Sequence, residues 1–201
     1  MDKQSSLLVV DVQIDFCPGG SLAVPGGDAI IPVINRYIEI FRTRGIPVFA
    51  SRDWHPPITG HFREFGGLWP PHCVQGSVGA RFHPALKLPD DVIVVSKGMD
   101  PGRDDYSALQ ATLETGLPLQ EYLGNAGVAK LYICGLATDY CVRETSLDAL
   151  GAGLSVIVLK DAVKGVDLKA GDSTRALKEI TRAGAHLVDL AAIEKEASEG
   201  R

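Results

Sequence analysis

Three reactive side chains, a carboxylate, an amine and a thiol, each stand at the end of a short apolar run. They are Asp11, Lys97 and Cys141. A charge within an apolar segment is costly to bury unless it is paired, so Asp11 predicts a cationic partner, for which Lys97 is the obvious candidate. A thiol near a cation and at a helix start has a lowered pKa, which makes Cys141 a candidate nucleophile with Asp11 as its general base. The alternative is a structural ion pair beside a core cysteine.

A second cluster holds residue types that bind first-row transition metals. Asp53 and His55 are two residues apart, His61 lies six residues further on, and His72 adds another imidazole. One carboxylate and three imidazoles suit Zn, Fe or Mn better than Ca or Mg. Solvated loop histidines are the alternative interpretation. Two further donors compete for the same role: Cys73 and His83.

Aromatic residues flank both clusters, where they could enclose a flat ring. They are Phe16, Trp69 and Tyr106, and core packing is the alternative for each. Residues 135–138, just before Cys141, supply backbone N–H groups at a helix start, which can stabilise a developing oxyanion.

The remaining thiols look unreactive. Cys134 is predicted to be mid-strand, buried and inert, and Cys17 is predicted to border the site without reacting. Four cysteines in a chain that shows no secretory signal are better interpreted as thiols than as a disulfide framework.

A sheet of parallel strands must position these residues. Continuous apolar runs rich in Val, Ile and Leu predict strands that are buried on both faces. They lie at 7–12, 46–51, 92–96, 130–135 and 154–159, with a weaker run at 185–190. Segments of helical periodicity separate them, at 27–44, 107–126, 140–152 and 171–183. The alternation predicts a three-layer α/β/α fold around a six-stranded, parallel, doubly wound sheet. The carboxyl ends of its strands would bring Asp11, Lys97 and Cys141 to one edge.

Residues 53–91 are the exception, because they show little periodicity. This stretch contains both Trp and four of the five His, and a segment of that length without regular structure is usually functional or disordered. Its aromatic and imidazole side chains favour a functional role.

The net charge and the lengths of the apolar runs exclude nucleic-acid-binding and membrane-spanning proteins. The 20 Lys and Arg against 25 Asp and Glu give a net charge of −5, whereas a nucleic-acid surface needs clustered cations. No apolar run approaches the roughly 20 residues that span a bilayer. We therefore expect a cytoplasmic protein with one domain over 1–201, and no nucleic-acid or membrane partner.

The chain resembles the isochorismatase-like cysteine hydrolase superfamily over nearly its whole length, from about residue 7 to residue 190. An Asp, a Lys and a Cys in that order mark the superfamily, and an Asp-x-His followed by two further His marks its metal-dependent nicotinamidase branch. The segments that carry the resemblance are VDVQIDF at 10–16, DWH at 53–55, WPPHCV at 69–74, KG at 97–98 and ATDYCV at 137–142.

The resemblance implies a catalytic triad of Asp11, Lys97 and Cys141. The thiol would attack the carboxamide of nicotinamide, release ammonia, and yield nicotinate for NAD salvage after hydrolysis of a thioester. Pyrazinamide is expected to be cleaved in the same way. An oxyanion hole from the N–H groups of Ala137 and Cys141 is implied, with a cis peptide between Leu136 and Ala137.

The resemblance also implies one divalent metal that anchors the pyridine nitrogen, zinc first, with iron or manganese as alternatives. Its ligands would be Asp53, His55, His61 and His72. The ring would be lined by Phe16, Trp69, Tyr106 and Ala137. Several relatives form oligomers, so a homo-oligomer is compatible with the family.

The departures from the family pattern are small. The family often has Asp-Ser-Tyr-Ser, a small residue and Phe around Tyr106, whereas this chain has Asp105 before the tyrosine and Leu109 in place of the Phe. Two other functions stay open. One is a sibling hydrolase that acts on isochorismate or a carbamoyl compound, although such relatives generally lack the metal set. The other is a catalytically idle module that binds partners through the long loop. The joint presence of the triad residues argues against this second function.

Overall fold

Seven strands, one more than the sequence predicts, form one sheet in the computed structural model, which describes residues 2–199. The strands are β1 (Ser5–Val10), β2 (Val48–Asp53), β3 (Ile93–Lys97), β4 (Thr112–Leu113), β5 (Lys130–Leu136), β6 (Ser155–Lys164) and β7 (His186–Val188). Their order across the sheet is β4-β3-β2-β1-β5-β6-β7, and the β3–β4 pair is antiparallel whereas the other pairs are parallel. The predicted doubly wound α/β fold is confirmed, with a short antiparallel strand added at one edge.

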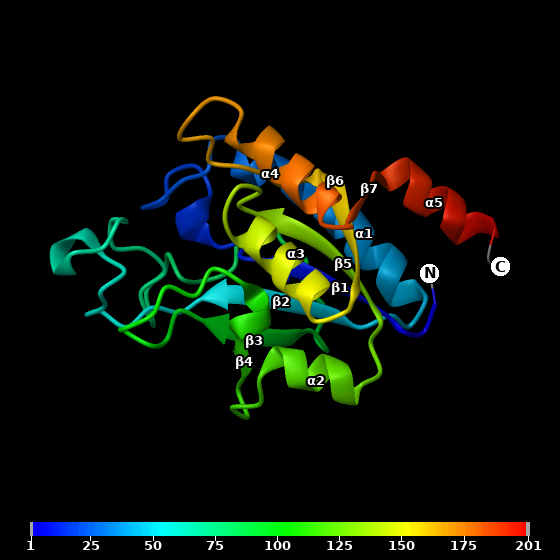
Figure 1. Ribbon diagram of the computed structural model, residues 1–201, viewed down its shortest axis with the longest axis horizontal. Helices are drawn as coiled ribbons and strands as arrows, with labels where there is room; N and C mark the ends of the chain where they lie inside the picture. Colours follow the sequence, from blue (N-terminus) through cyan, green and yellow to red (C-terminus); the bar gives the residue numbers. More distant parts are fainter. Residues whose placement is uncertain (1, 200–201) are drawn as a thin grey trace.

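Helices cover both faces of the sheet (Figure 1). They are α1 (Ile31–Thr43), α2 (Leu119–Asn125), α3 (Cys141–Gly151), α4 (Asp172–Arg182) and α5 (Leu190–Glu199). Successive residues of β1 point to opposite faces: Leu7 and Val9 pack on the side of α1 and α5, and Leu8 and Val10 on the side of α2, α3 and α4. None of the helices within residues 2–199 combines the length and apolarity that a bilayer span requires.

The helix predicted over 107–126 is wrong in its first half. A single 3-10 turn (Ala108–Gln110) and strand β4 precede α2 there. Gly116 has a φ of +83°, and Pro118 disfavours helical backbone at the residue before it. The helix therefore begins only at Leu119.

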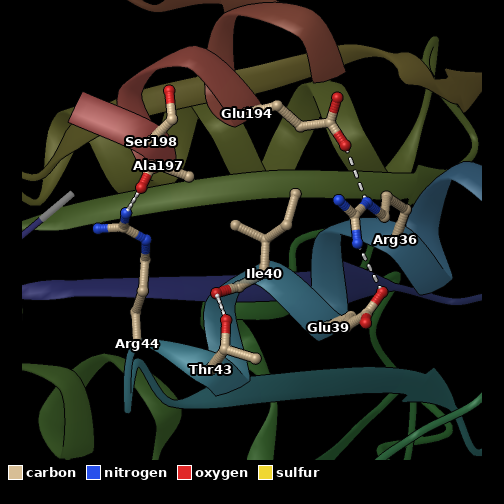
Figure 2. Close-up of a pocket in the computed structure, with 8 residues that line it drawn as sticks. All are labelled: Arg36, Glu39, Ile40, Thr43, Arg44, Glu194, Ala197 and Ser198. Carbon is tan, nitrogen blue, oxygen red and sulfur yellow. Dashed lines mark hydrogen bonds and ion pairs between the residues drawn. The ribbon is translucent and has the colours of Figure 1, made fainter. Parts of the chain in front are cut away.

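Helix α5, which the sequence analysis does not predict, packs on α1. Its Ile193 is buried in the same core cluster as the apolar face of α1. Figure 2 shows two polar links between the helices: Nε of Arg36 lies 2.8 Å from Oε1 of Glu194, and Arg44 donates to the carbonyl of Ala197. Tertiary contacts of this kind, rather than helix propensity alone, stabilise a short terminal helix.

The direction of winding reverses between β1 and β5, and open α/β sheets bind ligands at such a point. The chain leaves β1 through β2 and β3, then returns to β5 on the other side of β1. Asp11 follows β1, Lys97 ends β3, and residues 137–141 follow β5. Gly135 has a φ of +115°, and a Cβ there would lie 2.1 Å from the carbonyl oxygen of Val10. Only glycine permits this close approach of the two strands beneath the crevice.

Candidate active site

A buried ammonium lies between two buried carboxylates at the carboxyl edge of the sheet. Nζ of Lys97 is 2.9 Å from Oδ2 of Asp11 and also contacts Oδ1 of Asp53. Asp53 and Lys97 are register partners at the ends of β2 and β3, so strand pairing itself places them side by side. Burial would lower the pKa of Lys97, but the two carboxylates outweigh it and raise that pKa well above its usual value. The predicted Asp11–Lys97 pair is therefore a cluster of three charges.

The thiol of Cys141 completes this group. Its Sγ is 3.5 Å from Nζ of Lys97, and it lies at the first residue of α3. The sequence predicts a lowered pKa here, and this is wrong, because burial raises the pKa of the thiol well above its usual value. Lys97 opposes the rise, whereas the carboxylates and a hydrogen bond to Asp11 add to it. The resting residue is a thiol that must lose its proton before it can attack.

Asp11 is placed to accept that proton. Burial raises the pKa of its carboxyl group, with Lys97 opposing the rise and Asp53 adding to it. Ser51 Oγ donates a hydrogen bond of 2.7 Å to Oδ1 of Asp11 and holds the carboxylate in place. A buried carboxyl group with a raised pKa is a better proton acceptor than one in water.

Three buried imidazoles face one another beside Asp53. One ring nitrogen from each of His55, His61 and His72 lies within 4.8 Å of the others. Nε2 of His55 is 3.7 Å and Nε2 of His72 is 3.9 Å from Oδ2 of Asp53. Asp53 thus presents one oxygen to Lys97 and the other to the imidazoles, and all four predicted metal ligands converge.

Each imidazole is oriented by an acceptor outside the cluster. Nδ1 of His55 is 3.0 Å from the carbonyl of Gly98, Nδ1 of His72 is 2.8 Å from the carbonyl of Pro70, and Nδ1 of His61 contacts the carboxylate of Asp104. A carbonyl oxygen can only accept a hydrogen bond, so the ring proton sits on Nδ1. The lone pair of Nε2 is then available to coordinate a metal. Burial lowers the pKa of His72 to about 4 and also lowers that of His61, which keeps both rings neutral.

The donor set fits a transition metal. Nε2 of His55 is buried and has no hydrogen-bond partner among residues 2–199, a costly arrangement unless that atom has a ligand. Neutral imidazoles with a carboxylate are the ligands that zinc and its neighbours prefer. Gly98 makes room for this ring, since a Cβ there would lie 2.5 Å from Cε1 of His55.

An aromatic pocket opens onto both clusters. Phe16, Trp69, Tyr106 and Ala137, all predicted to bind a ring, line it together with Cys141. Nε1 of Trp69 donates to the Tyr106 hydroxyl at 2.8 Å, which fixes both rings. The pocket is also bordered by Asp53, His61 and His72, whereas Asp11, Lys97 and His55 lie outside its wall.

Sequence reasoning missed several wall residues: Leu22, Val24, Tyr140 and Val166. Asp105, which it singles out as a departure from the family pattern, also lines the wall. Tyr140 could have been found from its position next to Cys141; its ring centroid is 5.1 Å from that of Trp69. Val166 had no comparable signal, because β6 runs five residues beyond its predicted end. The Asp139 carboxylate then accepts the N–H groups of Val166 and Asp167 at 2.9 and 2.8 Å, which holds Val166 in the wall.

The turn between β5 and α3 supplies unpaired backbone donors. The Leu136–Ala137 peptide is cis, as predicted. Thr138 N–H donates to the carbonyl of Lys164, and Val142 N–H to the carbonyl of Ala137. The N–H groups of Ala137 and Cys141 have no acceptor within the described part of the chain. These are the two donors that the sequence analysis assigns to an oxyanion hole.

Neither competing donor, Cys73 or His83, joins the group of imidazole nitrogens found among residues 2–199. Cys73, Cys17 and Cys134 are buried in the hydrophobic core on the α1 side, and burial raises the pKa of each thiol. His83 instead accepts a hydrogen bond of 3.2 Å from the N–H of Ala85.

Comparisons with known proteins agree in one family. Residues 5–192 match the model of the isochorismatase domain. A nicotinamidase of Escherichia coli is 42% identical over 92% of this chain and 95% of its own. A pyrazinamidase of Pyrococcus horikoshii, solved in complex with zinc, has a TM-score of 0.85 and 46% identity, covering 93% of this chain and 99% of its own. A protein of L. infantum, solved in complex with nicotinate, has a TM-score of 0.84 and 36% identity, covering 94% of each chain.

Proposed function

Since the chain belongs to the isochorismatase family, as its resemblance predicts, we propose that it is an amidohydrolase that converts nicotinamide to nicotinate and ammonia. The observation that carries the proposal is the contact of Cys141, Lys97 and Asp11 beside an aromatic pocket bordered by metal-ligand residues. Relatives named as nicotinamidase and pyrazinamidase support this substrate class and extend it to pyrazinamide.

The first half-reaction forms a thioester. Asp11 takes the proton of the Cys141 thiol, and the thiolate, with Lys97 beside it, attacks the carboxamide carbon. The N–H groups of Ala137 and Cys141 stabilise the oxyanion of the tetrahedral intermediate. Asp11 returns the proton to the amide nitrogen, the C–N bond breaks, and ammonia leaves.

The second half-reaction hydrolyses the thioester. Asp11 is again a carboxylate and takes a proton from water, whose oxygen attacks the thioester carbon. The C–S bond breaks, Cys141 recovers the proton from Asp11, and the acid is released as nicotinate after it loses its own proton to solvent. The same carboxyl group thus serves both steps, which its contact with Lys97 and the thiol permits.

The pocket wall and the imidazole cluster orient the substrate. Phe16, Trp69 and Tyr106 enclose the pyridine ring. Asp53, His55, His61 and His72 would hold one divalent metal, with zinc first because the P. horikoshii relative was solved with zinc. When bound, that metal supplies a Lewis acid for the pyridine nitrogen.

An ammonia-release assay on nicotinamide, with metal-loaded and chelator-treated protein, tests the proposed function. We expect turnover with metal and a strong loss without it. Absence of turnover by metal-loaded protein would contradict the proposal and favour a sibling hydrolase that acts on isochorismate or a carbamoyl compound. We place the reaction in NAD salvage in the cytoplasm, which the four buried free thiols support.

Replacing His55 by alanine will lower the metal content and raise KM for nicotinamide. His55 Nε2 is the buried imidazole nitrogen without a partner in residues 2–199, so its loss removes a ligand. Losing one of four ligands weakens metal binding by at least about tenfold, since even loss of an outer partner costs about that much. The metal-to-protein ratio after dialysis, measured by atomic absorption, checks this. His83→Ala, a loop histidine outside the cluster, is the control, and an equal ratio in both variants would remove His55 from the ligand set.

Replacing Asp139 by alanine will raise KM several-fold more than it lowers kcat. Its carboxylate holds two backbone N–H groups of the loop that carries Val166 into the pocket wall. Substrate contact is lost, whereas Cys141 and Lys97 keep their own partners. Asp172→Ala is the matched control, because Asp172 accepts the N–H of Lys169 in the same loop but does not border this pocket. Steady-state kinetics decide, and an unchanged KM would show that Asp139 does not position the wall.

A further inference from the structure

Asp105 places a carboxylate in the wall of the substrate pocket. It stands where the family often has serine, directly before Tyr106. Its side chain is only 10% exposed, and it lines the same pocket as Cys141 and Trp69. The mechanism proposed above gives this residue no role.

The charge of Asp105 is poorly compensated. Oδ1 is buried and has no hydrogen-bond partner among residues 2–199. The same oxygen lies 3.3 Å from Nη2 of Arg103, an ion pair that lacks the geometry of a hydrogen bond. The Arg103 side chain is 62% exposed, and an ion pair to such a solvated cation is weak. Asp105 therefore adds a negative field inside the pocket.

The other charges near the pocket do not cancel this field. Of the described residues that line the pocket, Asp53 and Asp105 carry acidic groups, and none is Lys or Arg. The buried cation of the chain beside the pocket, Lys97, is already shared between Asp11 and Asp53. A metal held by Asp53 and the imidazoles would add the same positive charge to the wild type and to every Asp105 variant, so the contribution of Asp105 is the difference between them.

We propose that Asp105 is a specificity-determining residue that selects against anions, and that it favours the neutral carboxamide over the carboxylate product. This inference rests on the proposed function. The amide and the acid have nearly the same shape, so packing alone separates them poorly, whereas a fixed negative charge acts only on the acid. The same field disfavours anionic substrates of the sibling hydrolases and speeds release of nicotinate.

The test compares product inhibition with substrate use. Asp105→Asn keeps the size of the side chain and removes its charge, and Asp105→Ser restores the family residue. We expect the ratio of the nicotinate inhibition constant to KM for nicotinamide to fall about tenfold in both variants, because a single charge in a protein interior acts over several ångströms and Arg103 offsets part of it. Glu64→Gln, the same charge change on an exposed residue away from the pocket wall, is the matched control.

Two outcomes would overturn the inference. One is an unchanged ratio in both variants, and the other is an equal fall in Glu64→Gln. Calorimetric titration of nicotinate into metal-loaded protein measures the same change without turnover, and circular dichroism checks that each variant is folded. A wild-type protein that releases no ammonia would contradict the proposed function, whereas turnover with an unchanged ratio would contradict the role of Asp105 alone.

Discussion

Replacing Cys141 by alanine will abolish ammonia release from nicotinamide, with kcat reduced by at least about a thousandfold. The thiol is the one nucleophile among the described residues that contacts both Lys97 and Asp11. Without it no thioester forms, and direct attack by water must replace covalent catalysis. The change deletes one sulfur atom at the first residue of α3, so the fold is retained.

Cys134→Ala is the matched control for this variant. Cys134 is also fully buried, but its Sγ lies 3.8 Å from the carbonyl of Leu8, within the sheet. Its removal will leave ammonia release intact. Circular dichroism and kinetics on both variants make the comparison, and full activity in Cys141→Ala would rule out the thioester mechanism.

The placement of the triad residues could be predicted because it follows from topology. Continuous apolar runs indicate parallel strands, and parallel strands deliver their carboxyl ends to one edge. Asp11 and Lys97 end or follow such strands, and Cys141 follows another one turn later. This prediction needed no side-chain detail, so it holds although the sheet has seven strands rather than the six predicted.

Properties that depend on the register between strands or on how deeply a side chain is buried could not be predicted. Asp53 contacts Lys97 as well as the imidazoles because β2 and β3 pair in one register, and sequence does not reveal register. The pKa of Cys141 rises because burial outweighs the nearby cation, and local sequence does not measure burial. Val166 enters the pocket wall because β6 extends past its apolar run: after an irregularity, its pairing with β5 resumes at Val163 and Lys164.

Lys97 is the cation of a buried cluster with two carboxylates, so its loss affects stability as well as catalysis. Its ammonium pairs with both Asp11 and Asp53, which are buried. Removing one partner of a buried ion pair costs about 3–5 kcal/mol, because it leaves an uncompensated charge in a medium of low polarity. Two carboxylates share this cation, so their mutual repulsion adds to the cost.

Replacing Lys97 by methionine will therefore lower the free energy of unfolding by about 3–5 kcal/mol and abolish turnover. For a chain of this length the melting temperature should fall by roughly 10 °C, which differential scanning calorimetry of metal-free protein measures. Lys160→Met is the control, because Lys160 pairs with Asp189 at 3.0 Å on the surface, and this substitution should cost less than about 1 kcal/mol.

Adding Asp11→Asn to Lys97→Met removes one of the two unpaired charges. The double variant should recover part of the lost stability but no activity, since it lacks both the cation and the base. If the double variant is no more stable than Lys97→Met, the cost comes from lost packing rather than from buried charge.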